Sequence, residues 1–364
     1  MIPQSDPKRS FDAAQEDIQR AIQRVFERGL FILGPEAEAF EAEFATFLDV
    51  RHAVGVSSGT DAVALALSAA GLKPGDEVIT VSMTAVATAV AIEDAGGIPK
   101  FVDVDPATRC MDPRALAAAI GPRTAAVVPV HLHGFPTPME SIIAVARRYG
   151  LLIVEDCAQA HGAIYQGRRV GSFGHAAAFS FYPTKNLGAP GDAGAVVTDD
   201  PAIAQRVRRM RLYGWNDERN TVGPGSNRRI DELHAAVLRV LLPRLEAGNA
   251  ERRSLAHQYR SRLHDLDLEL PPHVDGAVYH QFAIAVEGRT ALQAFMAARG
   301  VQTAVHYPVG AHQQKRFACG ASALPVTERL SARLLSLPVQ PEVARDHLPE
   351  ICRVLAEGLR CNRS

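Results

Sequence analysis

The sequence predicts an α/β fold in which helices cover a mainly parallel sheet, followed by a smaller C-terminal α+β domain. Between about residues 50 and 200, short runs rich in valine, isoleucine and leucine alternate with helical patterns. These runs are almost continuously apolar, as expected of strands that are buried on both faces of a sheet. The chain also has 364 residues, which is more than one ordinary hydrophobic core accommodates.

The expected elements can be followed in order along the chain. A long helical stretch over residues 230–263 leads to a C-terminal unit with an expected strand over 279–287 and a helix over 289–300. We therefore expect a large domain over residues 1–245 and a small domain over residues 246–364. The first 30 residues or so predict a helix whose packing partner the sequence leaves open, the small domain being one candidate. In the large domain we expect strands over 52–56, 76–82, 99–105, 124–134, 151–157, 176–182 and 193–199, and helices over 60–71, 85–97, 112–120 and 139–150.

Composition argues against several classes of function. Hydrophobic residues make up 47% and charged residues 22%, and the formal net charge is −1, so nothing favours nucleic acid or an anionic membrane as a partner. We find no signal-peptide pattern and no apolar run of the roughly 18 residues that a membrane span requires. The five scattered cysteines, Cys110, Cys157, Cys319, Cys352 and Cys361, are typical of reduced thiols. We expect a cytoplasmic protein without a metal site.

A turn of small residues lies between the first expected strand and its helix. Ser57, Ser58, Gly59 and Thr60 permit close approach of the backbone, and Asp61 falls in the first helical turn. Free amides at a helix N-terminus bind phosphate. An ordinary N-cap explains the same residues and is, for this segment alone, the more common case.

Two carboxylates, Glu155 and Asp156, end a strand that is otherwise expected to be fully buried. Each must be paired, because burying a lone charge is costly. Asp156 could cap a neighbouring turn, but it could also hold the cationic ring nitrogen of a cofactor. In that case Gln159 and His161 would lie near other polar atoms of the ring, although a single histidine is more often a core residue.

Lys185 follows the expected strand over residues 176–182. Strand side chains alternate between the two faces, so Ser180 and Tyr182 lie on the face opposite Phe179 and Phe181. Pro183 ends the strand. Most lysines are solvated surface residues. Against an apolar wall, however, desolvation lowers the pKa of a lysine and supplies the neutral amine that a Schiff base requires.

A phosphate cradle, a buried carboxylate and a lysine at a strand exit are together what pyridoxal phosphate requires. On these and further motifs the chain resembles the DegT/DnrJ/EryC1/StrS family of pyridoxal-phosphate-dependent nucleotide-sugar aminotransferases. The matching segments are "FILGPEAEAFE", "SSGTDA", "GDEVIT", "FVDVDP", "VEDCAQAHGA", "GSFGHAAAFSFYPTKNLGAPGDAGAV", "NRRIDELHAA" and "HYPVGAHQQ".

The resemblance implies the aspartate-aminotransferase-like fold type I, with a sheet of the seven-stranded type, and it implies a role for each matched residue. Lys185 would form the internal aldimine with pyridoxal phosphate and then move protons as a general base and acid. Asp156 would pair with the pyridine nitrogen, and Gln159 would contact the ring hydroxyl. Asn227 would reach the site of a second subunit, which implies a homodimer. The remaining phosphate contacts would come from Ser58, Gly59, Thr60 and Ser180.

The resemblance also implies a reaction in two halves. Glutamate gives its amino group to the cofactor, which then aminates a ketone on a nucleotide-linked (dTDP, UDP or GDP) deoxyhexose. The sequence names neither the nucleotide nor the hexose, and it leaves open whether the 3- or the 4-keto position reacts. The residues that we expect near this substrate are His161, Tyr182, His306, Tyr307 and His312.

The sequence departs from the family pattern at a few positions. Ala85 aligns with an aromatic residue that stacks on the cofactor ring in many members, so Met83, Thr84 or another neighbour would have to position the ring. Arg228 stands where a small residue or a tyrosine is common, which could alter the subunit contact or the nucleotide site.

Other activities remain open at this stage. A sugar dehydratase of the same family uses the cofactor without net transfer of an amine, but such enzymes often lack the lysine. A cyclitol aminotransferase would share all of the motifs. A cofactor-binding regulatory protein is the alternative that involves no catalysis, and it would have no need of Lys185.

Overall fold

The computed structural model describes residues 1–318 and 323–361, so Cys319 lies outside the described residues. Its centre is a seven-stranded sheet with the strand order β1-β9-β8-β5-β4-β2-β3. All neighbours pair in parallel except at β9, which is antiparallel to both β1 and β8. The expected mainly parallel sheet is confirmed. The strands are β1 (His52–Val56), β2 (Glu77–Val81), β3 (Ile98–Val102), β4 (Thr124–Val128), β5 (Leu152–Asp156), β8 (Ala176–Ser180) and β9 (Gly194–Thr198).

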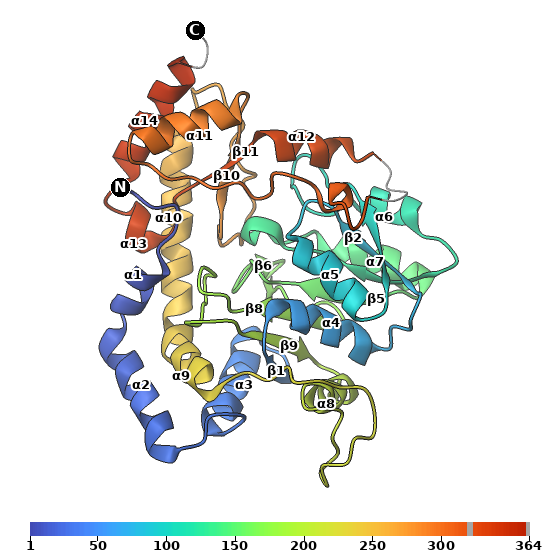
Figure 1. Ribbon diagram of the computed structural model, residues 1–364. Helices are drawn as coiled ribbons and strands as arrows, with labels where there is room; N and C mark the ends of the chain where they lie inside the picture. The colour runs from blue at the N-terminus through green and yellow to red at the C-terminus, as the bar shows by residue number, and fades with distance from the viewer. Residues whose placement is uncertain (319–322, 362–364) are drawn as a thin grey trace.

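Helices cover both faces of this sheet (Figure 1). Alternate strand residues face opposite layers: Val54 packs with α4, α5 and α8, whereas Ala53 packs with α3 and α9. Helices α6 and α7 cover the second face beside β2 to β5. The helices of this part are α1 (Pro7–Asp12), α2 (Gln15–Arg28), α3 (Pro35–Leu48), α4 (Gly59–Ala70), α5 (Val86–Asp94), α6 (Pro113–Ala119), α7 (Met139–Tyr149), α8 (Pro201–Met210) and α9 (Glu232–Leu241). This part also contains a short hairpin, formed by β6 (Ile164–Tyr165) and β7 (Arg168–Arg169), and the 3-10 turn η1 (Leu132–Gly134).

The C-terminal part is built on a second, two-stranded sheet of β10 (Phe282–Ala285) and β11 (Leu334–Leu337). In one hydrophobic cluster it packs with the long helix α10 (Leu245–Leu263) and with three further helices, α11, α13 and α14, whose bounds are given below. The division into domains at residue 245 stays a prediction. The other elements are α11 (Arg289–Ala298), η3 (Ala311–Gln313), α12 (Pro325–Arg333), α13 (Pro341–Ala344) and α14 (Leu348–Cys361).

Several expected boundaries are wrong. The strand expected over 124–134 ends at Val128, because Pro129 has no amide proton, and Leu132–Gly134 form the 3-10 turn η1. The helix expected over 230–263 is interrupted by the 3-10 turn η2 (Leu242–Arg244), because Pro243 lacks an amide donor and cannot continue an α-helix. Strand β8 ends at Ser180 rather than at Tyr182, since its pairing with β9 ends there. The amide of Phe181 still donates to the carbonyl oxygen of Ala193 at 2.7 Å, so the chain stays anchored beyond the strand.

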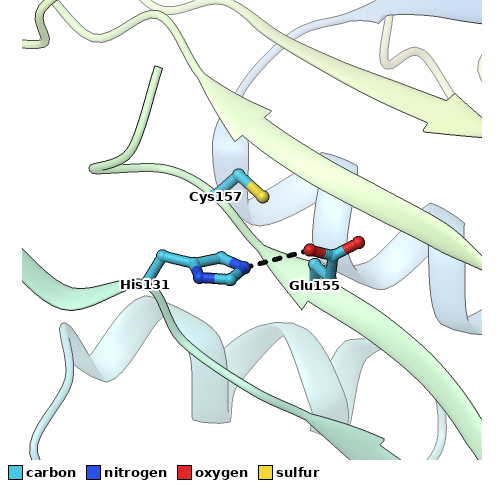
Figure 2. A group of neighbouring side chains, drawn as sticks. All are labelled: His131, Glu155 and Cys157. Carbon is cyan, nitrogen blue, oxygen red and sulfur yellow. Dashed lines mark hydrogen bonds and ion pairs between the residues drawn. The ribbon is translucent and has the colours of Figure 1, made fainter. Parts of the chain in front are cut away.

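Glu155 is fully buried and ties the end of β5 to the segment that leads into β8. Its carboxylate accepts hydrogen bonds from the amides of Gly171, Phe173 and Gly174 at 2.8–2.9 Å. It also accepts the Nε2 proton of His131 at 3.1 Å (Figure 2). Burial alone would raise the pKa of this carboxyl, but the hydrogen bonds from His131 and the amides hold it below the usual value. The expectation that this buried carboxylate is paired is confirmed.

His131, Glu155 and Cys157 lie close enough together to suggest metal ligands (Figure 2). The hydrogen bonds explain the group without a metal. Nδ1 of His131 accepts the amide of Thr137 at 2.9 Å, so Nε2 carries the proton that it shares with Glu155. Burial and the neighbouring carboxylates raise the pKa of the Cys157 thiol well above its usual value, so it stays protonated. We interpret the group as a structural junction.

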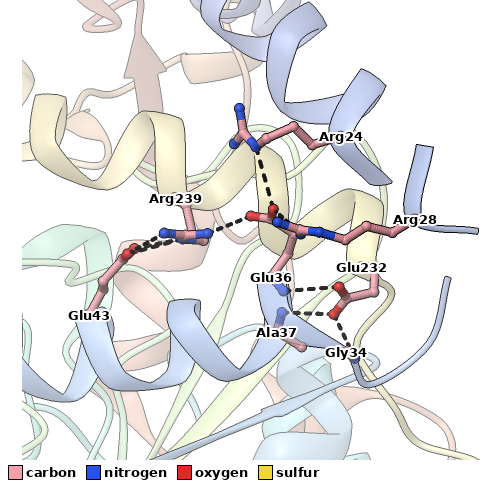
Figure 3. Close-up of polar contacts among 8 residues, drawn as sticks. All are labelled: Arg24, Arg28, Gly34, Glu36, Ala37, Glu43, Glu232 and Arg239. Atoms are coloured by element: carbon pink, nitrogen blue, oxygen red, sulfur yellow. Dashed lines mark hydrogen bonds and ion pairs between the residues drawn. The ribbon is translucent and has the colours of Figure 1, made fainter. Parts of the chain in front are cut away.

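Glu232, at the start of α9, caps α3 (Figure 3). Its carboxylate accepts the amides of Gly34, Glu36 and Ala37 at 2.8–2.9 Å, which satisfies the donors that a helix N-terminus leaves free. The buried carboxylate of Glu36 pairs with arginines of α2 and α9, and Nη1 of Arg239 lies 2.6 Å away. This network joins α2, α3 and α9. The N-terminal helix α2 therefore packs in the large domain, where its apolar residues contact helix α9.

Among the described helices, no segment is both long enough and apolar enough to cross a membrane.

Candidate active site

Two of the predicted site residues end neighbouring parallel strands. Asp156 is the last residue of β5 and Ser180 is the last residue of β8, and Asp156 pairs with Ala178 across the two strands. The carboxyl ends of such strands form the usual ligand site of a parallel sheet. The N-terminus of α4 lies against the same edge, because Gly59 meets Ser180 there.

The turn from β1 into α4 is packed so closely that only glycine fits at two positions. A Cβ atom on Gly59 would lie 2.4 Å from Cβ of Ser180, and one on Gly194 would lie 2.3 Å from the carbonyl oxygen of Ser58. Ser58 is the N-cap: its hydroxyl accepts the amide of Asp61 at 3.1 Å. The amides of Gly59 and Thr60 precede the first intrahelical donor. Together with the Ser180 hydroxyl they form a cradle suited to a phosphate.

The carboxylate of Asp156 is 5% exposed and is fixed from two sides. It accepts the hydroxyl of Thr88 at 2.8 Å and the amide of Ala158 at 3.1 Å. The Thr88 oxygen in turn lies 3.0 Å from the hydroxyl of Thr84, which must be the donor because the Thr88 proton is already used. The sequence analysis missed Thr88. Its only signal was the spacing of Thr84 and Thr88, four residues apart at the start of α5.

Lys185 lies on a turn after β8, and its amide donates to the carbonyl oxygen of Tyr182 at 2.9 Å. Its ammonium group has no hydrogen-bond or ion-pair partner within residues 1–318 and 323–361. Burial lowers the pKa of Lys185 to about 8, although the charge of Asp156 acts in the opposite direction. About a tenth of this amine is therefore neutral at pH 7, far more than the roughly 1 in 3,000 of an ordinary lysine. The neutral amine is the form that attacks a carbonyl group.

Gln159 is anchored by its oxygen and keeps a proton available on its nitrogen. Oε1 accepts the amide of His133 at 2.7 Å, and Nε2 donates to the hydroxyl of Tyr307 at 2.9 Å. His133 Nε2 also lies 3.0 Å from the carbonyl oxygen of His306. Predicted residues from two distant segments, Gln159 and the pair His306–Tyr307, therefore meet directly.

The histidines near Lys185 are neutral at pH 7. Burial, together with the charge of Lys185, lowers the pKa of His161 to about 3 and that of His306 to about 4. His161 packs against Phe179 and Phe181 with ring centroids 5.5 and 5.6 Å apart, as a core residue would. The site thus holds little positive charge besides the lysine.

Other predicted residues have structural contacts that the sequence did not indicate. Met83 is 1% exposed and belongs to the apolar core, so it offers no free face to a ring. Ala85 is half-buried at the N-cap of α5. Both ring nitrogens of His312 are engaged, with Ser82 at 2.5 Å and Glu328 at 3.2 Å, which leaves this ring no donor or acceptor for a substrate. Tyr182 and Asn227 are exposed.

The lowered pKa of Lys185 predicts a pH-dependent stability in the cofactor-free protein. Between about pH 8 and 10.5 the unfolded chain binds this proton and the folded chain does not. The free energy of unfolding should therefore rise with pH across that window, by up to about 3 kcal/mol, and this rise should be missing in Lys185→Met. Denaturant unfolding of both proteins at pH 7.5, 9 and 10.5 measures the difference. Parallel pH dependences would contradict the shift.

Comparisons with known proteins agree with this geometry. The DegT/DnrJ/EryC1/StrS aminotransferase family matches residues 12–356. The dTDP-3-amino-3,4,6-trideoxy-alpha-D-glucose transaminase of Streptomyces venezuelae is 44% identical, over 97% of this chain and 94% of the relative. The UDP-N-acetyl-3-dehydro-alpha-D-glucosamine 3-aminotransferase of Acidithiobacillus ferrooxidans is 43% identical, over 98% of both chains.

The fold agrees as well. The crystal structure of S. venezuelae DesV in complex with a ketimine intermediate superposes with a TM-score of 0.95 at 42% identity, over 98% of both chains. The family implies pyridoxal phosphate as the cofactor, and the residues described above suit it: a phosphate cradle, a buried carboxylate and a lysine whose pKa burial lowers to about 8. By sequence and by fold, the chain belongs to the DegT/DnrJ/EryC1/StrS aminotransferase family.

Proposed function

We propose that this protein is a pyridoxal-phosphate-dependent aminotransferase that moves the amino group of glutamate to a keto carbon of a nucleotide-linked deoxyhexose. The observation that carries the proposal is the buried amine of Lys185, with a pKa of about 8, in the field of the Asp156 carboxylate. When bound, the cofactor supplies an electron sink for chemistry at the carbon that bears the amine.

Each residue then has a task that its surroundings support. Lys185 holds the cofactor and, once displaced, carries a proton between the donor carbon and the cofactor as general base and acid. Asp156, fixed by Thr88, keeps the ring nitrogen protonated. Gln159 retains a free proton on Nε2 for the ring hydroxyl. The phosphate is held by the amides of Gly59 and Thr60 and by the hydroxyl of Ser180.

We further propose that the keto group lies at carbon 3 of the sugar. The names of both relatives described above place the amino transfer at carbon 3, in one case of a dTDP-sugar and in the other of a UDP-sugar. His306 and Tyr307 stay our candidates for substrate contacts, together with Tyr182 at the exposed rim. His161 and His312 are weaker candidates, because one packs in the core and the other is fully hydrogen-bonded.

The assembly that we propose is a homodimer in which Asn227 of one subunit completes the phosphate site of the other. Its support is the position of Asn227, which is exposed on the segment that runs along the edge strand β1. We also expect a cytoplasmic location, because Cys110, Cys157 and Cys352 are buried thiols outside any disulfide.

The absorbance spectrum tests the proposed reaction. Glutamate should convert the band of the lysine-bound cofactor into that of the pyridoxamine form, and a 3-keto dTDP- or UDP-sugar should then reverse the change. A 4-keto sugar tests the position. A spectrum that does not respond to glutamate would argue against transamination, and a response only to the 4-keto sugar would overturn the assignment to carbon 3.

A further inference from the structure

Arg228 joins three separate segments beside the phosphate cradle. Its Nε donates to the hydroxyl of Ser226 at 2.8 Å, Nη1 lies 3.3 Å from Asp61, and Nη2 lies 2.7 Å from Asp94. The side chain is 22% exposed, so these ion pairs are partly shielded from water. Asp61 belongs to the first turn of α4 and Asp94 is the last residue of α5.

The position of Asp61 gives the first ion pair its importance. The carboxylate belongs to the first turn of α4, and its Oδ2 accepts the hydroxyls of Ser57 and Ser58, in the same turn that carries the amides of Gly59 and Thr60. Those amides suit a doubly charged phosphate, which a neighbouring carboxylate repels. Within the described residues, Arg228 is the one cation that lies within ion-pair distance of Asp61. The positive charge of Arg228 therefore offsets the negative charge of Asp61 beside the cradle.

The second feature is the segment that carries Asn227. The carbonyl oxygen of Arg228 accepts the amide of Ser57 at 3.2 Å, and its own amide donates to the carbonyl oxygen of Arg211 at 3.1 Å. Arg229 continues this contact by bridging to Val56 in β1. One residue after the exposed Asn227, the backbone is thus fixed to the start of the cradle turn through the carbonyl of Arg228 and to the end of α8 through its amide.

We propose that Arg228 is a positioning residue that sets the affinity of the phosphate site. It neutralises Asp61 next to the bound phosphate, and through Asp94 it holds the Asn227 segment against α4 and α5. This inference rests on the proposed function, because it assumes that the cradle binds the phosphate of the cofactor. It assigns a role to an arginine at a position where the family pattern commonly has a small residue or tyrosine.

The test uses pyridoxamine 5′-phosphate, which binds without a bond to Lys185, and pyridoxamine, which lacks the phosphate. Arg228→Gln should weaken binding of the phosphorylated probe about 10-fold or more, as expected for one lost charge compensation near the ligand, and should leave pyridoxamine unchanged. A surface cavity of about 650 Å³ already borders Arg228, so the shorter side chain creates no enclosed void. Fluorescence titration measures both dissociation constants.

Two further variants separate charge from tethering. Adding Asp61→Asn to Arg228→Gln should restore most of the affinity for the phosphorylated probe, because the repulsion disappears with the carboxylate. Asp94→Asn removes only the second ion pair and should raise the dissociation constant of the phosphorylated probe less than threefold. If Arg228→Gln is poorly folded, the double variant and Arg228→Lys, which retains the charge, should still bind the phosphorylated probe more tightly than Arg228→Gln does.

The outcomes distinguish this inference from the proposed function. Unchanged affinity in Arg228→Gln, or an equal loss for both probes, would overturn the role of Arg228 in the phosphate site. If the unmodified protein itself bound both probes equally, or bound neither, the phosphate site and with it the proposed function would be wrong.

Discussion

Replacing Lys185 with alanine is expected to lower kcat for transamination by about 10⁴-fold, the upper end of what a positioned acid–base group contributes. Within residues 1–318 and 323–361 the structure offers no substitute for this amine. Burial and the charge of Lys185 lower the pKa of His161 to about 3, that of His306 to about 4 and that of His280 well below its usual value. These rings are therefore poorly suited to accept a proton at neutral pH. The measurement is the rate of conversion between the two cofactor forms after mixing with glutamate.

Three comparisons make this prediction specific. Lys73→Ala, at an exposed lysine, should leave the rate unchanged. Lys185→Arg keeps a positive charge that cannot be removed at any working pH, so it should be as inactive as the alanine variant. Methylamine added to Lys185→Ala should recover part of the rate, because a small amine can enter the space left by the side chain. Near-normal activity of Lys185→Ala would show that another group moves the proton.

Lys185 and its neighbours show why part of the site could be predicted from the sequence. Asp156 and Ser180 each lie at the end of a strand that is recognisable by its continuous apolar composition, and Lys185 lies on the turn that follows Ser180. In a parallel sheet those ends necessarily share one edge. Their proximity therefore follows from local pattern and topology alone, and the pairing of Asp156 with Ala178 confirms it.

Other parts of the site depend on contacts between segments far apart in the chain. Thr88 holds Asp156 from helix α5, 68 positions earlier in the chain, and Tyr307 contacts Gln159 across 148 positions. No periodicity encodes such contacts, because they arise only when the packed elements have their final separation. The same reason explains His312: its motif suggested a substrate contact, whereas tertiary packing gives both of its nitrogens protein partners.

Asp156→Asn is expected to lower kcat by about 10³-fold, within the range assigned to a preorganised charge in a buried site. Asparagine keeps the size of the side chain, and its Oδ1 can still accept the amide of Ala158, but the oxygen that accepts from Thr88 becomes an NH2 group. The loss therefore combines the negative charge with one hydrogen bond, and Thr88→Val measures that hydrogen bond separately. That charge has two tasks. In the proposed function it would keep a proton on the ring nitrogen of the cofactor. It also raises the pKa of Lys185 against the effect of burial.

The second task gives the prediction a signature that a structural defect would not produce. Without the Asp156 charge the pKa of Lys185 should fall further, so the pH dependence of the first half-reaction should move to lower pH as its rate drops. Thr88→Val, which removes one hydrogen bond but keeps the charge, should lower the rate only about 10-fold, in line with one lost bond to a charged group. Asp217→Asn, at an exposed carboxylate, serves as the matched control. A variant Asp156→Asn within threefold of the normal rate would show that protonation of the ring nitrogen does not depend on this carboxylate.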